Sequence, residues 1–217
     1  MKVRLDELCL EAETAVQENR NVLILSDRAT SAERVPIPTL LAIGTIHHHL
    51  NRIRKRMRAS LVIESGETRD VHQIACCFGF GATAICAYLG YATVRQLVAT
   101  DAGKGKLGEI SAQKAMTHYR KALEKGIFKI MSKMGISVLN SYQGAQTFEA
   151  IGVGNEVIDF AFTGAPSKID GVGFTEIAEE SLIRHKAAFE TVVPNGKTLN
   201  LGDPGYNRYR KAGELHV

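Results

Sequence analysis

The chain has 217 residues, of which 45% are apolar, so one sizeable domain or one compact half of a larger unit can bury a core. The net charge is only +4, which argues against the dense basic surface of a nucleic-acid-binding protein. No run of about 18 apolar residues occurs, so no membrane span is expected.

The N-terminal part of the chain switches between helix and strand patterns. Apolar residues at helical spacing predict an amphipathic helix over residues 4–19, rather than a signal peptide. The continuous apolar run 22–25 predicts a strand that is buried on both faces. Pro36 and Pro38 then open a second helix, which continues to about Arg52.

The same alternation continues through the middle of the chain. Expected there, in order, are a buried strand at 61–63, a helix near 68–78, a strand at 83–86, helices near 88–99 and 111–134, a fourth strand at 136–139 and a short helix at 143–151. Four repeats of strand and helix, with nearly all-apolar strands, predict an α/β fold with parallel strands and helices outside. The sheet is either open, as in doubly wound folds, or half-barrel-like, because four units are half of an eight-unit barrel.

The loops after the strands are the expected place for any site. Residues 26–28, 64–67 and 140–144 follow three of the predicted strands, and sites in parallel α/β folds lie at that edge. Asp27, Arg28, Glu64 and Glu67 are the charged candidates at the edge. No nucleophile–base pair is evident among them, so we expect ion pairing there, and catalytic residues stay unknown.

The C-terminal part is rich in turns. Residues 152–173 hold five glycines and are expected to be loop, with brief ordered pieces around 157–162. Thr175 is expected to cap a last helix over 176–189. From Val192 the chain is polar, so we divide it into an α/β module, residues 1–190, and a linker or tail, residues 191–217.

Cysteines and histidines do not form a metal motif. Cys9, Cys76, Cys77 and Cys86 contain no C-x-x-C pair, and buried, reduced thiols are expected. Side chains of three successive residues on a helix, such as 47–49, point about 100° apart and cannot converge on one ion. His47, His48 and His49 are therefore expected to be structural, and His72 has no partner at a suitable spacing.

Two glycine-containing segments resemble nucleotide-binding motifs only in part. Residues 79–84 match the pattern G-x-G-x-x-A, but a helix is expected before them and a strand after them, the reverse of the dinucleotide fingerprint. A helix stop and a turn are expected there instead. Residues 103–106 lack the serine or threonine of a phosphate-binding loop and are expected to form an exposed loop.

The predicted helix 111–134 carries a basic stripe. Its members recur every three or four residues: Lys114, His118, Lys121, Lys125, Lys129 and Lys133. The stripe is either an ordinary solvated face opposite the core or a surface that docks to an acidic protein.

Several segments in one order resemble the later part of the central domain of the glutamate synthase family. The segments are LILSDR (23–28), VPIPTLLAIGTIHHHL (35–50), LVIESGETRDVHQIA (61–75), GFGATAICAYL (79–89), KGIFKIMSKMGISVLNSYQGAQTF (125–148), FTGAPSKIDGVG (162–173), EIAEESLIRHKAAF (176–189) and RYRKAGELH (208–216). Two places depart from the family pattern, because Ala87 stands where a proline is expected and residues 201–207 diverge.

The resemblance implies a connecting role. In this family the central domain joins an amidotransferase domain to an FMN domain, and the whole enzyme makes glutamate from glutamine and 2-oxoglutarate with FMN and an iron–sulfur cluster. It draws electrons from ferredoxin or from an electron-donor subunit, in the cytoplasm or the plastid stroma. No cysteine here matches the amidotransferase or cluster motifs, so we expect no cofactor and no metal in this chain.

Two functions stay open on the sequence. The chain is either a structural and interaction module of glutamate synthase, expected to be inactive alone, or an autonomous small α/β enzyme or ligand-binding protein that uses the loops after its strands. The flanking coding sequence separates the two, because continuation into amidotransferase and FMN-domain motifs supports the first.

Overall fold

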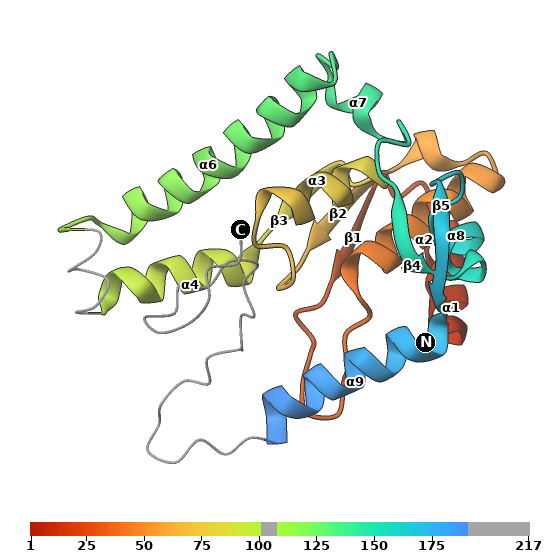
Figure 1. Cartoon of the computed structure of the whole chain (residues 1–217), viewed down its shortest axis with the longest axis horizontal. Helices are drawn as coiled ribbons and strands as arrows, with labels where there is room; N and C mark the ends of the chain where they lie inside the picture. Colours follow the sequence, from red (N-terminus) through yellow and green to blue (C-terminus); the bar gives the residue numbers. More distant parts are fainter. Residues whose placement is uncertain (101–107, 191–217) are drawn as a thin grey trace, which may run out of the picture.

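Three parallel strands form the central sheet of the protein. The computed structural model describes residues 1–100 and 108–190. The sheet has the order β1-β2-β3, with β1 at Val22–Ser26, β2 at Ser60–Glu64 and β3 at Ala84–Cys86 (Figure 1). All three strands are parallel and follow one another in chain order, which confirms the predicted parallel α/β architecture.

Helices cover one face of this sheet. They are α1 (Lys2–Gln17), α2 (Thr39–Arg52) and α3 (Val71–Gly79), and a short 3₁₀ helix, η1, spans Arg56–Arg58. Leu61 and Ile63 of β2 are fully buried against Val16 of α1 and against Ile43 and Leu50 of α2. Successive right-handed crossovers that advance in one direction place their helices on the same face, as in a segment of a barrel, but this sheet is open.

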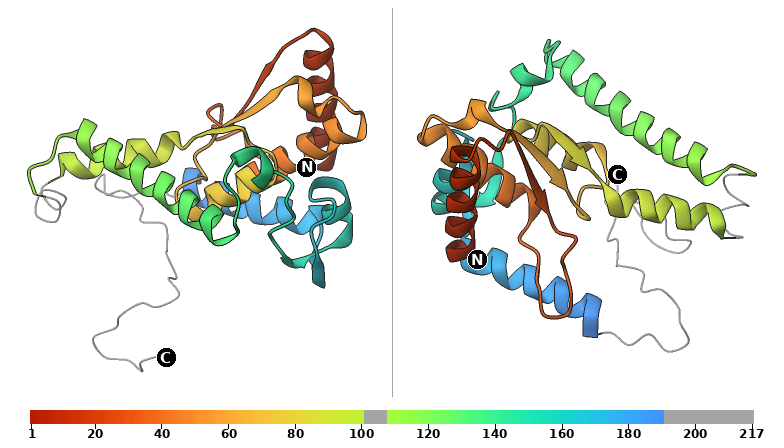
Figure 2. Two further views of the ribbon diagram at one scale, coloured as in Figure 1. Left: turned by 90° about the horizontal axis from the view of Figure 1, so that it is seen from above. Right: turned by 180° about the vertical axis from the view of Figure 1, so that it is seen from behind.

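The opposite face of the sheet is bare in the described part of the chain. Side chains of Val22 and Ile24 are 57% and 64% exposed. Ile24, Val62 and Ala84 are partners across the three strands, so they share this face. Seen from behind, no helix lies in front of the strands (Figure 2). The expectation that residues 22–25 are buried on both faces was therefore wrong, because an apolar run reports two apolar faces and not what covers them.

Helix α2 lies between the sheet and a second, smaller layer. That layer pairs β4 (Ala150–Val153) with β5 (Ser167–Val172) in parallel, joined by α8 (Asn155–Ala161). A Cβ on Gly44 of α2 would lie 2.4 Å from the carbonyl oxygen of Ala161, so only glycine permits this approach. This close contact explains why α2 is buried on both sides.

Three predictions for residues 143–176 were wrong. The helix predicted at 143–151 is absent, because 143–149 form no helix or strand and 150–151 start β4. Residues 152–173 are mostly ordered as β4, α8 and β5. The glycines of this region lie at turns and close approaches between ordered elements, as Gly152 does with φ of 70°, and do not mark a continuous loop. Helix α9 (Phe174–Glu190) starts before Thr175, and the Glu176 carboxylate accepts from the N–H of Gly173 instead.

Two helices lie side by side and extend away from the sheet. They are α4 (Tyr88–Ala99) and α6 (Ala112–Lys133), with the short α7 (Leu139–Tyr142) after them (Figure 1). The predicted fourth strand at 136–139 was wrong: the short apolar run leads into α7, whose Tyr142 is fully buried against α3 and α6. No described helix has the length and apolar character that crossing a membrane requires.

Candidate functional site

Charged side chains gather where the strands of the central sheet end. Asp27 and Arg28 follow β1, Glu64 is the last residue of β2, and Glu67 lies three residues further on. The hydrogen bonds described below connect Asp27 to Ser65 and Arg28 to Glu64. The prediction that these loops meet at one edge is confirmed for both, since parallel strands bring their carboxyl ends together.

The third predicted loop lies elsewhere. The N–H of Gly144 donates to the carbonyl of Gly79, and the Gln143 amide donates to the carbonyl of Ala82, both of which precede β3. Residues 140–144 therefore sit near the start of β3, at the opposite end of the sheet. Without a strand at 136–139, nothing carries this segment to the carboxyl edge.

Asp27 holds the loop that follows β2. Its Oδ2 accepts from the Ser65 hydroxyl at 3.1 Å and from the backbone N–H of Gly66 at 2.8 Å. Ser65 is 1% exposed and its hydroxyl also lies 2.7 Å from that of Thr39, the first residue of α2. The backbone N–H of Thr39 donates to Glu67 at 2.6 Å, which places a carboxylate at the start of α2. The carboxylates of Asp27 and Glu67 thus connect the loop after β2 to the start of α2.

Glu64 is engaged by a second set of contacts. Its carboxylate accepts from the Ser26 hydroxyl at 2.6 Å and from Nε of Arg28. The hydrogen bond from Ser26, followed by that from Arg28, lowers the pKa of Glu64. The Arg28 guanidinium also lies 4.1 Å from the ring centre of Tyr88. A carboxylate with a lowered pKa is a poor general base near neutral pH, so the role of Glu64 is its ion pair with Arg28 rather than proton transfer.

Tyr88 completes the cluster and was not singled out from the sequence. Burial, together with the neighbouring Asp27 carboxylate, raises the pKa of Tyr88 to about 12, so its phenol stays protonated. The other Asp27 oxygen, Oδ1, is buried without a well-formed hydrogen bond to any described residue. Tyr88 could have been found by position, because it follows β3 as Asp27 follows β1.

A cavity of about 210 Å³ opens beside this edge. Its lining includes Asp27 and Glu64 together with apolar residues of β1 and of the segment before α2, such as Ile24 and Ile37. Ligand sites for small molecules usually measure about 300–1,000 Å³, so this cavity is small. Its charged lining residues are two of each sign, Asp27 and Glu64 with Arg4 and Arg34, so the cavity has no net charge.

The three consecutive histidines differ in their contacts, although the rings of His47 and His48 pack edge to face with centroids 5.0 Å apart. His47 is 8% exposed, and its Nδ1 accepts from Nε of Arg56 at 2.9 Å. Burial and the Arg56 charge lower the pKa of His47 to about 4. His49 instead lies 3.3 Å from the Glu13 carboxylate on α1. These roles are structural.

The cysteines are dispersed over three elements. All four are free thiols, and burial raises the pKa of Cys9 to about 11 and that of Cys77 to about 12. Cys76 is partly buried, whereas Cys86 at the end of β3 is exposed, so the expectation of burial was wrong for Cys86. The bare sheet face is the reason. Within residues 1–100 and 108–190, no three His, Cys, Asp or Glu side chains gather as metal ligands would.

The glycine segment 79–84 has the context that was expected. Helix α3 ends at Gly79 and β3 begins at Ala84, so the segment is a helix stop and a turn. Gly81 has φ of 109° and lies against His47. The other glycine segment, 103–106, lies outside the described residues.

Comparison with known proteins identifies the family. Residues 1–154 match the glutamate synthase central domain. The chain is 41% identical over 223 residues to the ferredoxin-dependent glutamate synthase of Pyropia yezoensis, covering all of this chain and 14% of that protein. It is 42% identical to the NADH glutamate synthase of Schizosaccharomyces pombe (98% of this chain, 10% of that protein) and 41% identical to the NADPH glutamate synthase large chain of Bacillus subtilis (98% and 13%).

The chain thus spans about a tenth to a seventh of the length of these relatives. The chain belongs to the glutamate synthase central-domain family.

Proposed function

We propose that this chain is a structural module of a glutamate synthase, which contributes to glutamate formation from glutamine and 2-oxoglutarate through contacts with other domains. The observation that carries the proposal is the state of the strand-end residues. The carboxylates of Asp27, Glu64 and Glu67 each accept hydrogen bonds from the protein itself, and Tyr88 stays protonated. Such a network fixes loops and offers no activated nucleophile.

The bare face of the central sheet also supports a connecting role. Parallel sheets are normally covered on both faces, yet Val22 and Ile24 are largely exposed here. An apolar sheet face of this kind suits contact with another protein surface. In the proposed assembly, amidotransferase and FMN domains are the neighbours.

We propose that this chain binds neither FMN nor an iron–sulfur cluster, the cofactors that this family implies. A cluster is held by several cysteine thiolates, whereas Cys9, Cys77 and Cys86 belong to different elements and burial keeps the first two thiols protonated. The strand-end cavity, at about 210 Å³, is smaller than the roughly 300–1,000 Å³ of usual small-molecule sites, which disfavours FMN there. We place both cofactors in other domains of the full enzyme.

The electron donor does not distinguish the relatives of this segment. Those named for ferredoxin, NADH and NADPH share 41%, 42% and 41% identity with the chain. Equal similarity supports a role that all of them need, whether a ferredoxin or a donor subunit serves the full enzyme. Relatives from Arabidopsis thaliana and Spinacia oleracea are named as chloroplastic, and we propose the cytoplasm or the plastid stroma as the location.

A second candidate is an autonomous enzyme or ligand-binding protein. The cavity beside Asp27 and the unsatisfied Oδ1 of that residue favour it. Calorimetric titration of the purified chain with glutamine and with 2-oxoglutarate separates the two functions. The module predicts no saturable heat. Saturable binding that disappears in Arg28→Met, but persists in the exposed control Arg95→Met on α4, would replace the module with the second candidate.

A further inference from the structure

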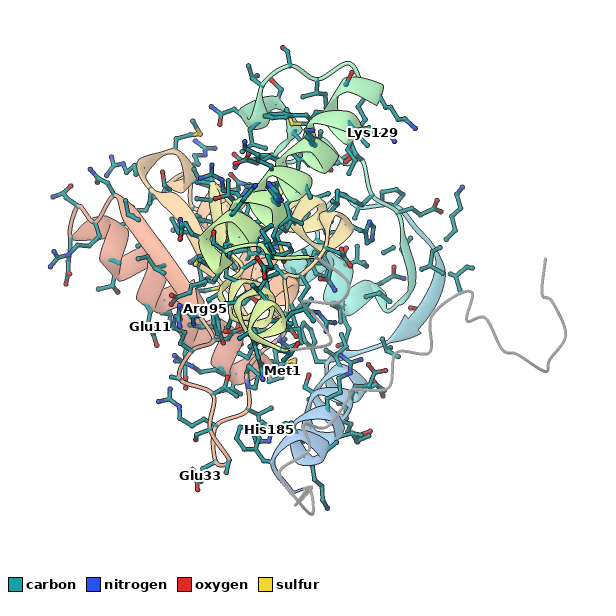
Figure 3. The ribbon with its side chains drawn as sticks, turned by 90° about the vertical axis from the view of Figure 1, so that its left-hand side faces the viewer. Met1, Glu11, Glu33, Arg95, Lys129 and His185 are labelled. Atoms are coloured by element: carbon teal, nitrogen blue, oxygen red, sulfur yellow. The ribbon has the colours of Figure 1, made fainter. Side chains whose placement is uncertain are left out.

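Helix α6 presents a face of lysines to solvent. The lysine face consists of Lys114, Lys121, Lys125 and Lys129, and all four side chains are exposed. At 100° per residue, Lys121 and Lys125 lie within about 20° of Lys114 around the helix axis, and Lys129 lies about 60° from it. The four residues extend over about 22 Å along the helix. Figure 3 labels Lys129 on the outer side of the helix.

The packing of α6 fixes this face outward. Ile127 and Met131 are buried against α3, on the opposite side of the helix. A Cβ on Gly126 would lie 2.4 Å from a methyl carbon of Val71, so the two helices approach too closely for any larger residue. The Tyr119 hydroxyl donates to the carbonyl of Arg69 at 2.7 Å, which ties α6 to the start of α3. The helix cannot rotate to bury its lysines without losing these contacts.

The lysine face is not neutralised within the described part of the chain. None of its four lysines forms an ion pair with a described residue. The only acid within α6, Glu124, pairs with Arg120 at 3.3 Å on the flank of the helix. Phe128, 66% exposed, borders the lysines beside Lys129 and offers an apolar contact at the edge of the face. The face therefore combines charge of one sign with an apolar anchor.

We propose that the lysine face of α6 is a docking surface for an acidic protein surface. Lysines act as point charges that attract carboxylates over a distance and accelerate association. Phosphate recognition favours the forked guanidinium of arginine, and this face has no arginine. A net charge of +4 and the single aromatic ring at the edge also fit a protein partner better than a nucleic acid. The inference goes beyond the proposed function and does not depend on it.

Charge reversal tests the docking surface. The probe is poly-L-glutamate, and its binding to the full chain is measured by fluorescence anisotropy at rising salt. The test variant carries Lys121→Glu, Lys125→Glu and Lys129→Glu. The control reverses the same number of exposed charges elsewhere, with Arg20→Glu, Arg58→Glu and Lys168→Glu. Circular dichroism confirms that each variant folds, and a triple Lys→Gln variant replaces the first if reversal unfolds α6.

The lysine face predicts at least about tenfold weaker binding in the test variant, a loss within about twofold in the control, and binding that weakens as salt rises. Equal losses in both variants would show that only net charge matters and would overturn the proposal. Tighter binding to duplex DNA than to poly-L-glutamate of matched charge would overturn it as well, in favour of a nucleic acid. None of these outcomes changes the expected absence of binding to glutamine and 2-oxoglutarate.

Discussion

Asp27→Ala should destabilise the chain strongly, because the Asp27 carboxylate holds the loop after β2. The substitution removes the acceptor for the Ser65 hydroxyl and for the Gly66 N–H, at 3.1 and 2.8 Å. A hydrogen bond to a charged group contributes about 1.5–3 kcal/mol, and half-burial of Asp27 places the sum near the lower end, at about 3 kcal/mol. For a domain of this size, the melting temperature should fall by roughly 6–12 °C.

Thermal and urea unfolding of the purified chain measure this effect, with Asp6→Ala on the exposed side of α1 as the control. The control should stay within about 0.5 kcal/mol of the parent, as surface substitutions usually do. Asp27→Asn keeps one acceptor oxygen and should lose less than Asp27→Ala. If Asp27→Ala were as stable as the control, the strand-end carboxylate would not be structural and would be free for binding or chemistry.

Three further predictions test the packing around the sheet. Ile24→Thr on the bare face should change the free energy of unfolding by less than about 1 kcal/mol, whereas Ile63→Thr on the covered face should lower it by more than about 2 kcal/mol. Urea unfolding measures both, and equal losses would show that the bare face is covered. Gly81→Ala should lower the free energy of unfolding by at least about 2 kcal/mol, because φ is 109° and the new Cβ would lie 2.1 Å from Nδ1 of His47. Gly135→Ala is the control and should lower it by only about 1 kcal/mol, because φ is 70° there and the space around it is open. The reverse order in thermal unfolding would refute this packing. Because the pKa of His47 falls from 6.5 to about 4 on folding, the unfolded chain binds more protons between these pH values, so stability is lost as the pH falls from 6.5 to 4. In His47→Gln, the stability measured by urea unfolding should depend less on pH over this range. An unchanged pH dependence would contradict a buried, neutral His47 ring.

The first half of the fold could be predicted from the sequence because local pattern and tertiary packing agree there. Residues 22–25 and 61–63 are short apolar runs between amphipathic helices, and both became parallel strands. The convergence of Asp27 and Glu64 followed directly from parallel strand order. The prediction of a strand at 136–139 was wrong because a short apolar run fits a strand or the start of a buried helix equally well. The packing of Tyr142 against α3 and α6 selects the helix.

The sequence does not show which elements cover a given face of the sheet or of a helix. The apolar pattern of β1 indicated two buried faces, but the winding of the chain puts every described crossover helix on one of them. In the same way, the spacing of the lysines on α6 revealed a charged face without showing that it is free of internal partners. Contacts between residues distant in sequence decide such features, and periodicity does not record them.

The visible absorption spectrum of the purified chain, after addition of FMN and removal of the excess, tests the central claim most directly. A module whose cofactors lie in other domains should remain colourless, because the strand-end carboxylates are occupied and the cavity beside them is small. A flavin spectrum retained in stoichiometric amount would contradict the account, and the loops around Asp27 and Glu64 would then be the place where the flavin binds.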